Sequence, residues 1–145
     1  MRSRVGNRAQ DFEIIDHTAD IGIIVHGKDL GETFANAAHA MFSLVADLSN
    51  VNESSCHEIK ASADDIEGLL VEWLNELIYL FDAENIIFKR FEVTDITTTE
   101  LKANGYGEKL NPSRHRLKMG IKAATYHMLQ VEKGDEFTAR VIFDV

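Results

Sequence analysis

The chain has 145 residues, of which 45% are hydrophobic and 27% charged, and its 24 acidic and 15 basic residues give a net charge of −9. This length fits one domain with a substantial core, and the composition is that of a globular protein. The acidic balance argues against strong direct binding of nucleic acid and favours a basic protein or a cation as partner. No apolar run reaches the roughly 18 residues of a membrane span.

The N-terminal segment and the cysteine content indicate a cytoplasmic protein. Residues 1–11 contain three arginines with no apolar stretch after them, so they do not resemble a secretory signal. We expect them to form a disordered lead-in to one domain over residues 12–145. Cys56 is the single cysteine, which excludes an internal disulfide and a cysteine-rich zinc site. The locally basic stretch over residues 109–122 has three open interpretations: contact with RNA, with a protein partner, or with solvent only.

Two strands and a helix are expected in the first third of the chain. Apolar residues on either side of Asp16–Asp20 predict two strands, or one bent strand, within Phe12–Gly27. Asp29, with Glu32 three residues later, indicates the start of a helix. That helix carries one apolar stripe at spacings of three and four, formed by Leu30, Phe34, Ala37, Met41, Phe42, Val45 and Leu48.

The rest of the chain is expected to form a second helix and several strands. After a short strand at His57–Ala61, acidic residues precede a wider apolar stripe from Ile66 to Phe81. From Ile86 onward the apolar period changes to two. This period predicts the strands Ile86–Phe88, Phe91–Thr99, Glu100–Gly107, Ile121–Glu132 and Glu136–Asp144, with a loop over Leu110–Lys118.

Two amphipathic helices and about six strands favour an α+β fold. The strands cluster in the second half of the chain instead of alternating with helices, which argues against a doubly wound parallel sheet. We therefore expect a single-domain, two-layer sandwich of about six mostly antiparallel strands, with both helices on one sheet face. The sequence has no Gly-x-Gly-x-x-Gly or Walker-type motif, so no familiar phosphate-binding loop is expected.

Asp20 and Asp144 each lie at the end of a strand-like run, near opposite ends of the sequence. Spacing alone favours two surface carboxylates that pair with Arg140 or Lys122. The alternative is a site for a hard cation, to which the terminal carboxylate of Val145 adds a further oxygen, because Ca²⁺ and Mg²⁺ prefer such ligands. The spacing matches no EF-hand loop, and both interpretations stay open at this point.

The histidines do not form a recognisable catalytic pattern. His17 lies in the polar stretch, but the sequence has no His-Glu-x-x-His motif, so a zinc-dependent enzyme is not predicted. Asp16 suits a turn cap as well as a metal ligand. His127 is interpreted as a satisfied strand residue and His39 as structural. No Ser or Cys nucleophile with a neighbouring base can be identified, which makes a metal-dependent hydrolase the least favoured class.

Four segments, in this order, resemble the archease family. They are Asp16–Gly22 (DHTADIG), Gly107-Glu108 ahead of Asn111-Pro112, Ile121–His127 (IKAATYH) and Phe143–Val145 (FDV). The resemblance runs from about Phe12 to the last residue. It implies a non-enzymatic protein that assists the GTP-dependent RNA ligase of tRNA splicing, which joins a 3′-phosphate or 2′,3′-cyclic phosphate to a 5′-hydroxyl. The family is thought to promote guanylylation of the ligase and its multiple turnover.

The same resemblance implies a divalent-cation site. The family's metal, described as calcium, maps onto Asp20, Asp144 and Val145, with Mg²⁺ or Mn²⁺ as alternatives. Around these ligands we expect a supporting set of residues formed by Asp16, His17, Lys122 and His127. The alternative function is that of a chaperone or specificity factor for another tRNA-processing enzyme, such as a tRNA methyltransferase.

Overall fold

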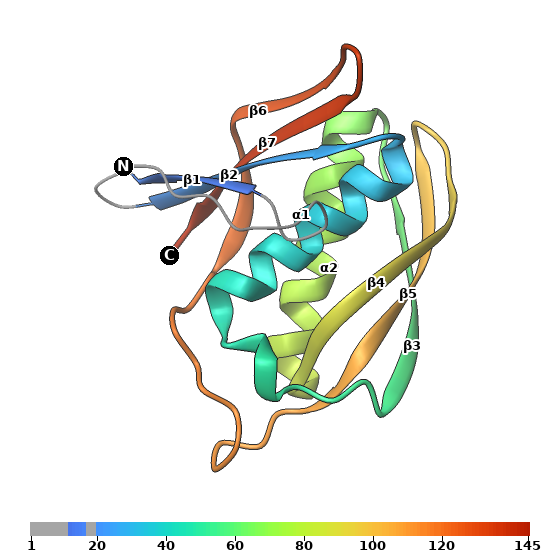
Figure 1. Cartoon of the computed structure of the whole chain (residues 1–145). Coiled ribbons are helices and arrows are strands. Elements are labelled where there is room, and N and C mark those ends of the chain that lie inside the picture. The colour runs from blue at the N-terminus through green and yellow to red at the C-terminus, as the bar shows by residue number, and fades with distance from the viewer. Residues whose placement is uncertain (1–11, 17–19) are drawn as a thin grey trace.

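The computed structural model describes residues 12–16 and 20–145, with the side chain of Asp16 excepted (Figure 1). Its elements in chain order are β1 (Phe12–Asp16), β2 (Asp20–Gly27), α1 (Leu30–Val45), the 3₁₀ helix η1 (Leu48–Asn50), β3 (Ser55–Ser62), α2 (Ile66–Glu84), β4 (Ile86–Ile96), β5 (Glu100–Lys109), β6 (Ala123–Lys133) and β7 (Phe137–Asp144). The expected α+β class is confirmed. The expected lead-in, residues 1–11, lies outside the described residues.

The seven described strands form two antiparallel sheets, where the sequence indicated about six strands in one sheet. One sheet has the order β1-β2-β7-β6 and the other has the order β3-β5-β4. The helices do not lie on one sheet face as expected. Instead they lie between the two sheets, where α1 contacts β4 and β2 while α2 contacts β6 and β3 (Figure 1).

The composition of α1 explains why the helix packs against two sheets. Its buried residues include alanines outside the predicted stripe, among them Ala38 and Ala40, which have no exposed surface. Small side chains let a second sheet approach the helix closely, and a pattern analysis that counts only large apolar residues does not register them. The buried surface of α1 is therefore wider than the sequence indicated.

Both helices begin at the predicted signals, and α2 also ends where expected, whereas α1 ends at Val45, before the last residue of its predicted stripe, Leu48, which lies in η1. The Asp29 carboxylate accepts a hydrogen bond from the Glu32 N–H at 2.8 Å, which caps α1. The Asp65 carboxylate accepts from the Gly68 N–H at 2.7 Å, and α2 ends at Asn85, which adopts the left-handed conformation with φ 57°. Neither of these helices is both long and apolar enough to cross a membrane.

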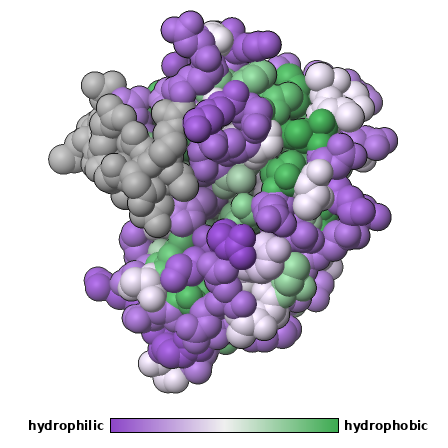
Figure 2. Space-filling view, turned by 45° about the vertical axis from the view of Figure 1, so that its right-hand side comes forward, coloured by the Kyte–Doolittle hydropathy of each residue, from purple (hydrophilic) through white to green (hydrophobic). Residues whose placement is uncertain are grey.

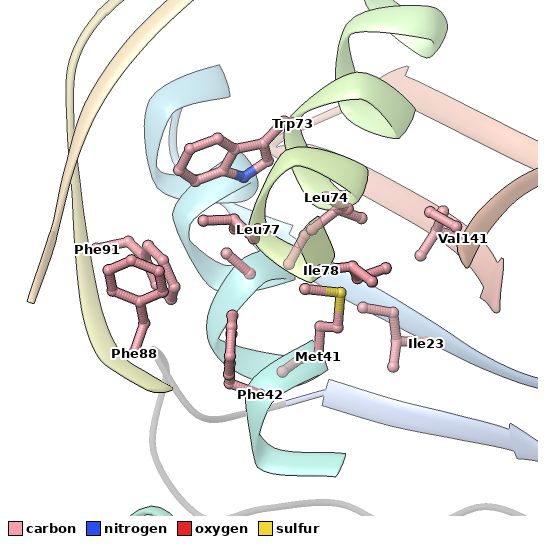
Figure 3. Close-up of a cluster of buried hydrophobic side chains, with 14 of the residues drawn as sticks. Ile23, Met41, Phe42, Trp73, Leu74, Leu77, Ile78, Phe88, Phe91 and Val141 are labelled. Carbon is pink, nitrogen blue, oxygen red and sulfur yellow. The ribbon is translucent and has the colours of Figure 1, made fainter. Parts of the chain in front are cut away.

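The core between the sheets is held by aromatic side chains (Figure 3). Phe42 of α1 packs edge to face on Phe88 of β4, with ring centroids 5.7 Å apart, and Trp73 of α2 packs in the same way on Phe91. The Trp73 indole N–H donates to the carbonyl of Phe34 at 2.9 Å, which links the two helices. The face seen in Figure 2 is mainly hydrophilic, with the largest group of apolar side chains in its upper half and a smaller group in its lower half.

Two strands depart from regular pairing. β4 is continuous from Ile86 to Ile96, where the sequence indicated two strands, and its register with β5 shifts between Phe88 and Arg90. The register of β6 with β7 shifts between Thr125 and Gln130, and Met128 in that interval has a φ of 52°. Such bulges redirect side chains, and simple alternation along the sequence cannot predict them.

Candidate functional site

The strands nearest the two ends of the chain bring Asp20 and Asp144 together. β2 pairs with β7 in the register that places Asp20 opposite Asp144, and β6 places Ala123 on the other side of Asp144. Residues directly opposite each other point to the same face of a sheet, so the two carboxylates share one face at the end of the sheet. We call Asp20, Asp144 and the adjoining Val145 the carboxylate rim.

The two aspartates of the rim form no salt bridge with a cationic side chain in the part of the chain that the structure describes. Asp20 is half-buried and Asp144 is exposed. The Oδ1 atom of Asp20 is buried and has no hydrogen-bond partner in the described part of the chain. No salt bridge among the described residues joins either aspartate to Arg140 or Lys122. Both aspartates lie at strand ends as spacing indicated, but the candidate pairing with Arg140 or Lys122 is not present among the described residues.

Register explains why these two cations do not pair with the rim. Arg140 lies opposite Ile24, two same-face rows from Asp144, and its Nε atom is itself buried without a hydrogen-bond partner in the described residues. Lys122 is exposed and directly precedes β6. Its backbone N–H donates to the Asp144 carbonyl at 2.8 Å, so Lys122 supports the rim through its main chain.

The chemistry of the rim fits a hard cation. Like charges in directly opposed positions repel, and a buried carboxylate oxygen without a donor carries a desolvation cost that a cation or a proton removes. Carboxylate and main-chain oxygens are the ligands that Ca²⁺ takes in proteins. The described side chains supply only two such groups, because no set of three or more His, Cys, Asp or Glu side chains among them is placed to hold a metal. A complete site thus needs oxygens of Val145 or ligands beyond these side chains.

The other predicted site residues are divided between the rim and the rest of the chain. Asp16 ends β1 opposite Ile21, so its backbone lies at the same end of the sheet as the rim. Its side chain and the whole of His17 lie outside the described residues. His127 lies four residues beyond Ala123, about 13 Å along an extended strand, within the bulge of β6. Its imidazole is exposed, and the register does not bring it to the rim.

A side chain of α2 holds the strand that borders the rim. The Ala124 N–H donates to Oδ1 of Asn75 at 2.8 Å, and Nδ2 of Asn75 donates back to the Ala124 carbonyl at 3.4 Å. Asn75 therefore pairs with this edge strand in the way that a neighbouring strand would. The contact fixes the start of β6, and with it the position of Asp144 on the adjacent strand.

Sequence reasoning missed a charged cluster around Glu108. The Glu108 carboxylate accepts two hydrogen bonds from the Arg114 guanidinium at 2.7 and 2.9 Å, one from His115 at 2.9 Å and one from the Asn52 N–H at 2.6 Å. The hydrogen bonds from Arg114, followed by that from Asn52, hold the pKa of Glu108 far below its ordinary value. Because Nδ1 of His115 accepts from the Asn111 N–H, its Nε2 carries the proton that faces Glu108.

The Glu108 cluster explains part of the basic stretch over residues 109–122. Arg114 and His115 belong to that stretch, for which three interpretations were left open, and both bind Glu108 and hold the loop after β5 in place. The available signal was the order Gly107-Glu108 followed by Asn111-Pro112, to which no role was assigned. A loop has no periodicity from which such a contact can be predicted.

Comparison with known proteins gives one consistent result. Residues 12–145 match the model of the archease protein family (MTH1598/TM1083). The chain is 38% identical over 144 residues to protein archease of Methanosarcina acetivorans, covering 96% of this chain and 99% of that one. It is 40% identical over 126 residues to protein archease of Pyrococcus abyssi, covering 84% and 88% of the two chains.

Solved structures agree with the sequence comparisons. The solution structure of protein 1598 of Methanobacterium thermoautotrophicum has a TM-score of 0.79 and 34% identity, covering 92% of this chain and 98% of that one. The crystal structure of an archease from Thermotoga maritima, described as a possible chaperone, has a TM-score of 0.65 at 23% identity, covering 90% and 94%, and it supports the fold alone. The family model and the relatives together show that this chain belongs to the archease family.

Proposed function

We propose that the protein is a non-enzymatic cofactor of tRNA splicing that promotes guanylylation and multiple turnover of the GTP-dependent RNA ligase in the cytoplasm. Membership of the archease family supports this proposal. The observation that carries it is the opposed pair Asp20 and Asp144, which forms an accessible acidic rim without a neutralising cation among the described side chains.

Asp20, Asp144 and an oxygen of Val145 would hold a divalent cation, and Ca²⁺ is the ion that such oxygens fit best, with Mg²⁺ or Mn²⁺ as alternatives. When bound, the ion would supply positive charge at a surface that is otherwise negative. The protein's own residues would then position the rim: the main chain of Lys122 holds Asp144, and Asn75 holds the strand beside it.

The rim would dock beside the ligase active site and act there by positioning groups. An acidic surface that carries a cation can order phosphate groups for attack by the nucleophile of the ligase, without any chemical step on this chain. This role requires an exposed site, and Asp144 and Val145 are exposed. It does not require a nucleophile or a general base at the rim.

A second function is a chaperone or specificity factor for a tRNA methyltransferase. The exposed side chains Tyr79, Tyr126 and Met128 favour it. Aromatic and Met side chains of this kind are enriched at protein interfaces. Both functions therefore predict a protein partner, and they differ in which enzyme is bound.

The test is formation of the ligase–GMP adduct with GTP and Mg²⁺, measured with and without substoichiometric amounts of this protein. The ligase and a tRNA methyltransferase are taken from the same source, and binding of each to this protein is measured in parallel. Faster guanylylation over several turnovers, with binding to the ligase, supports the proposed role. No effect on the ligase, combined with binding to the methyltransferase, overturns it in favour of the second function.

A further inference from the structure

A pocket of about 710 Å³ lies at the C-terminal end of α1, and no residue of the carboxylate rim lines it. This volume is in the usual range for small-molecule sites, about 300–1,000 Å³. One part of its wall is apolar and comes from β1, the end of α1 and the segment after it: Phe12, Ile14, Leu44, Ala46 and Leu48. The other part is polar and carries three cationic side chains: Lys89, Arg116 and Lys118.

Only one of these three cationic side chains has a hydrogen-bond partner among the described residues. The Lys118 ammonium donates to the Ser43 carbonyl at 2.7 Å, which satisfies an acceptor at the end of α1. The side chains of Lys89 and Arg116 make no hydrogen bond or salt bridge within the described residues. Lys89 is half-buried. Arg116 lies near enough to Asp47 to help lower the pKa of that carboxyl, but it forms no salt bridge with it among the described residues. A half-buried cation without a hydrogen-bond partner, in one pocket wall with a second cation, indicates a place for an anion.

Among the described residues that line the pocket, Asp47 is the one carboxylate. It accepts hydrogen bonds from the backbone N–H and the hydroxyl of Ser49, at 3.0 and 2.7 Å. These hydrogen bonds are the main reason why the pKa of Asp47 lies below its ordinary value, so it stays ionised. Three cations against this single carboxylate leave the pocket positive, on a protein whose net charge is −9.

His39 adds a neutral hydrogen-bonding group. Its Nδ1 lies 3.0 Å from the Lys89 carbonyl and donates to it, which leaves Nε2 as the acceptor of the ring. Burial is the main cause that lowers the pKa of His39 and keeps the ring neutral. A hydrocarbon tail against His39 would leave the Nε2 acceptor of the ring without a partner, whereas the hydroxyls of Ser43 and Ser49 already donate within the fold. A fatty acid therefore suits the pocket less well than a polar ring system does.

We propose that this pocket binds a phosphate-bearing nucleoside, with the phosphate at Lys89 and Arg116 and the nucleoside against the apolar wall. The same chemistry is offered by a free mononucleotide and by the terminal 3′-phosphorylated nucleotide of an RNA. Arg116 takes no part in the Glu108 cluster, and this inference assigns it a role in binding the phosphate. It does not rest on the proposed function, because no ligase takes part in the binding.

The test follows backbone and imidazole resonances of the ¹⁵N-labelled full chain during titration with GMP. Separate titrations use guanosine, inorganic phosphate, decanoate and a diribonucleotide with a 3′-phosphate. We expect saturable shifts at His39, Lys89 and Arg116 with GMP, and much weaker binding of guanosine and phosphate. We expect at least a tenfold loss of GMP affinity in the double variant Lys89→Ala/Arg116→Ala, and weaker binding as salt is raised.

The matched control is Lys60→Ala/Lys102→Ala, which removes two exposed lysines that pair with Glu58 on β3 and β5. It lowers the net charge by the same amount and should leave GMP affinity unchanged. Tighter binding of the diribonucleotide than of GMP identifies an RNA end as the source, and the reverse identifies a free nucleotide. Absence of saturable binding, equal losses in the two double variants, or preference for decanoate would overturn the inference. The ligase assay is independent of each of these results.

Discussion

Asp20 and Asp144 face each other directly across β2 and β7, although they lie near opposite ends of the sequence. The strand on the far side of Asp144 is β6, whose first residue is Ala123. Three of the four segments that resemble the archease family, around residues 16–22, 121–127 and 143–145, therefore meet at one end of one sheet.

If the rim binds a cation, removing either carboxylate charge should weaken binding. We expect Asp20→Asn and Asp144→Asn each to lower Ca²⁺ affinity at least tenfold in calorimetric titration, because one charged ligand is lost. Ca²⁺ should raise the midpoint of thermal unfolding of the native protein and a chelator should reverse the rise, since a ligand of the folded state stabilises it. Asp82→Asn, at an exposed position near the end of α2, is the control. Equal affinity in all four proteins would argue against the site.

The Glu108 cluster should make stability depend on pH in the acid range. The pKa of Glu108 in the folded state lies below the ordinary value of 4.5, mainly because of Arg114. The ionised Glu108 carboxylate therefore makes its full contribution to the free energy of unfolding above that value. This contribution is lost as the pH falls from about 5 towards 2. In Glu108→Gln we expect a lower free energy of unfolding at pH 7 and a shallower decline below pH 5, as measured by urea unfolding at several pH values.

The control for this prediction is Glu58→Gln, whose carboxylate pairs with two lysines at 3.6 and 3.8 Å on the exposed face of β3 and β5. Exposed pairs of this kind contribute little to stability. Its pH profile should follow that of the native protein. If the free energy of unfolding of Glu108→Gln depended on pH as that of the native protein does, the charge of Glu108 would not stabilise the fold.

Asn75 should matter for stability more than its polar side chain suggests. Asn75→Ala leaves the buried backbone N–H of Ala124 without its partner, which we expect to cost about 2 kcal/mol in the free energy of unfolding. The amide of Ala124 should also exchange faster with solvent deuterium. Glu72→Ala, at an exposed position on the same helix, should change stability by less than about 0.5 kcal/mol. Similar losses in the two variants would refute the role of Asn75.

Gly107, which adjoins Glu108, tests the packing between β4 and β5, and Gly120 serves as its control. A Cβ atom at Gly107 would collide with the carbonyl oxygen of Ile87 and lie 2.8 Å from Cα of Phe88, both of which are backbone atoms that cannot move aside cheaply. Gly107→Ala should therefore cost about 3 kcal/mol or more, or prevent folding. Gly120→Ala meets no atom within 4 Å and should be neutral within about 0.5 kcal/mol. Chemical denaturation of both variants measures the difference.

Local features of the fold were predictable, and long-range ones were not. Asp29 and Asp65 cap the two helices as their positions indicated, because a cap and an apolar stripe depend only on residues that are close together in the sequence. The division into two sheets depends on β1 and β2 pairing with β7 and β6 instead of with β3 to β5. Nothing in strand periodicity specifies that choice. The bulge around Met128 likewise depends on the register with β7.

The candidate site shows the same limit. Spacing left Asp20 and Asp144 open between a cation site and paired surface charges, and it was the resemblance that assigned them together to one site. Their opposed register is now visible, but it could not be derived from residues so distant in sequence. Glu108 was missed because its partners are a loop arginine, a loop histidine and a backbone N–H. Only the folded loop brings those donors to one carboxylate.

The most direct test of the central claim is the rate of ligase guanylylation supported by Asp144→Asn, compared with the native protein and with Asp82→Asn. The three proteins are used at equal, substoichiometric concentration, after their unfolding midpoints have been shown to agree. We predict that Asp82→Asn accelerates adduct formation as the native protein does, whereas Asp144→Asn gives no more than the rate of the ligase alone. Full acceleration by Asp144→Asn would contradict the claim that the carboxylate rim is the functional surface.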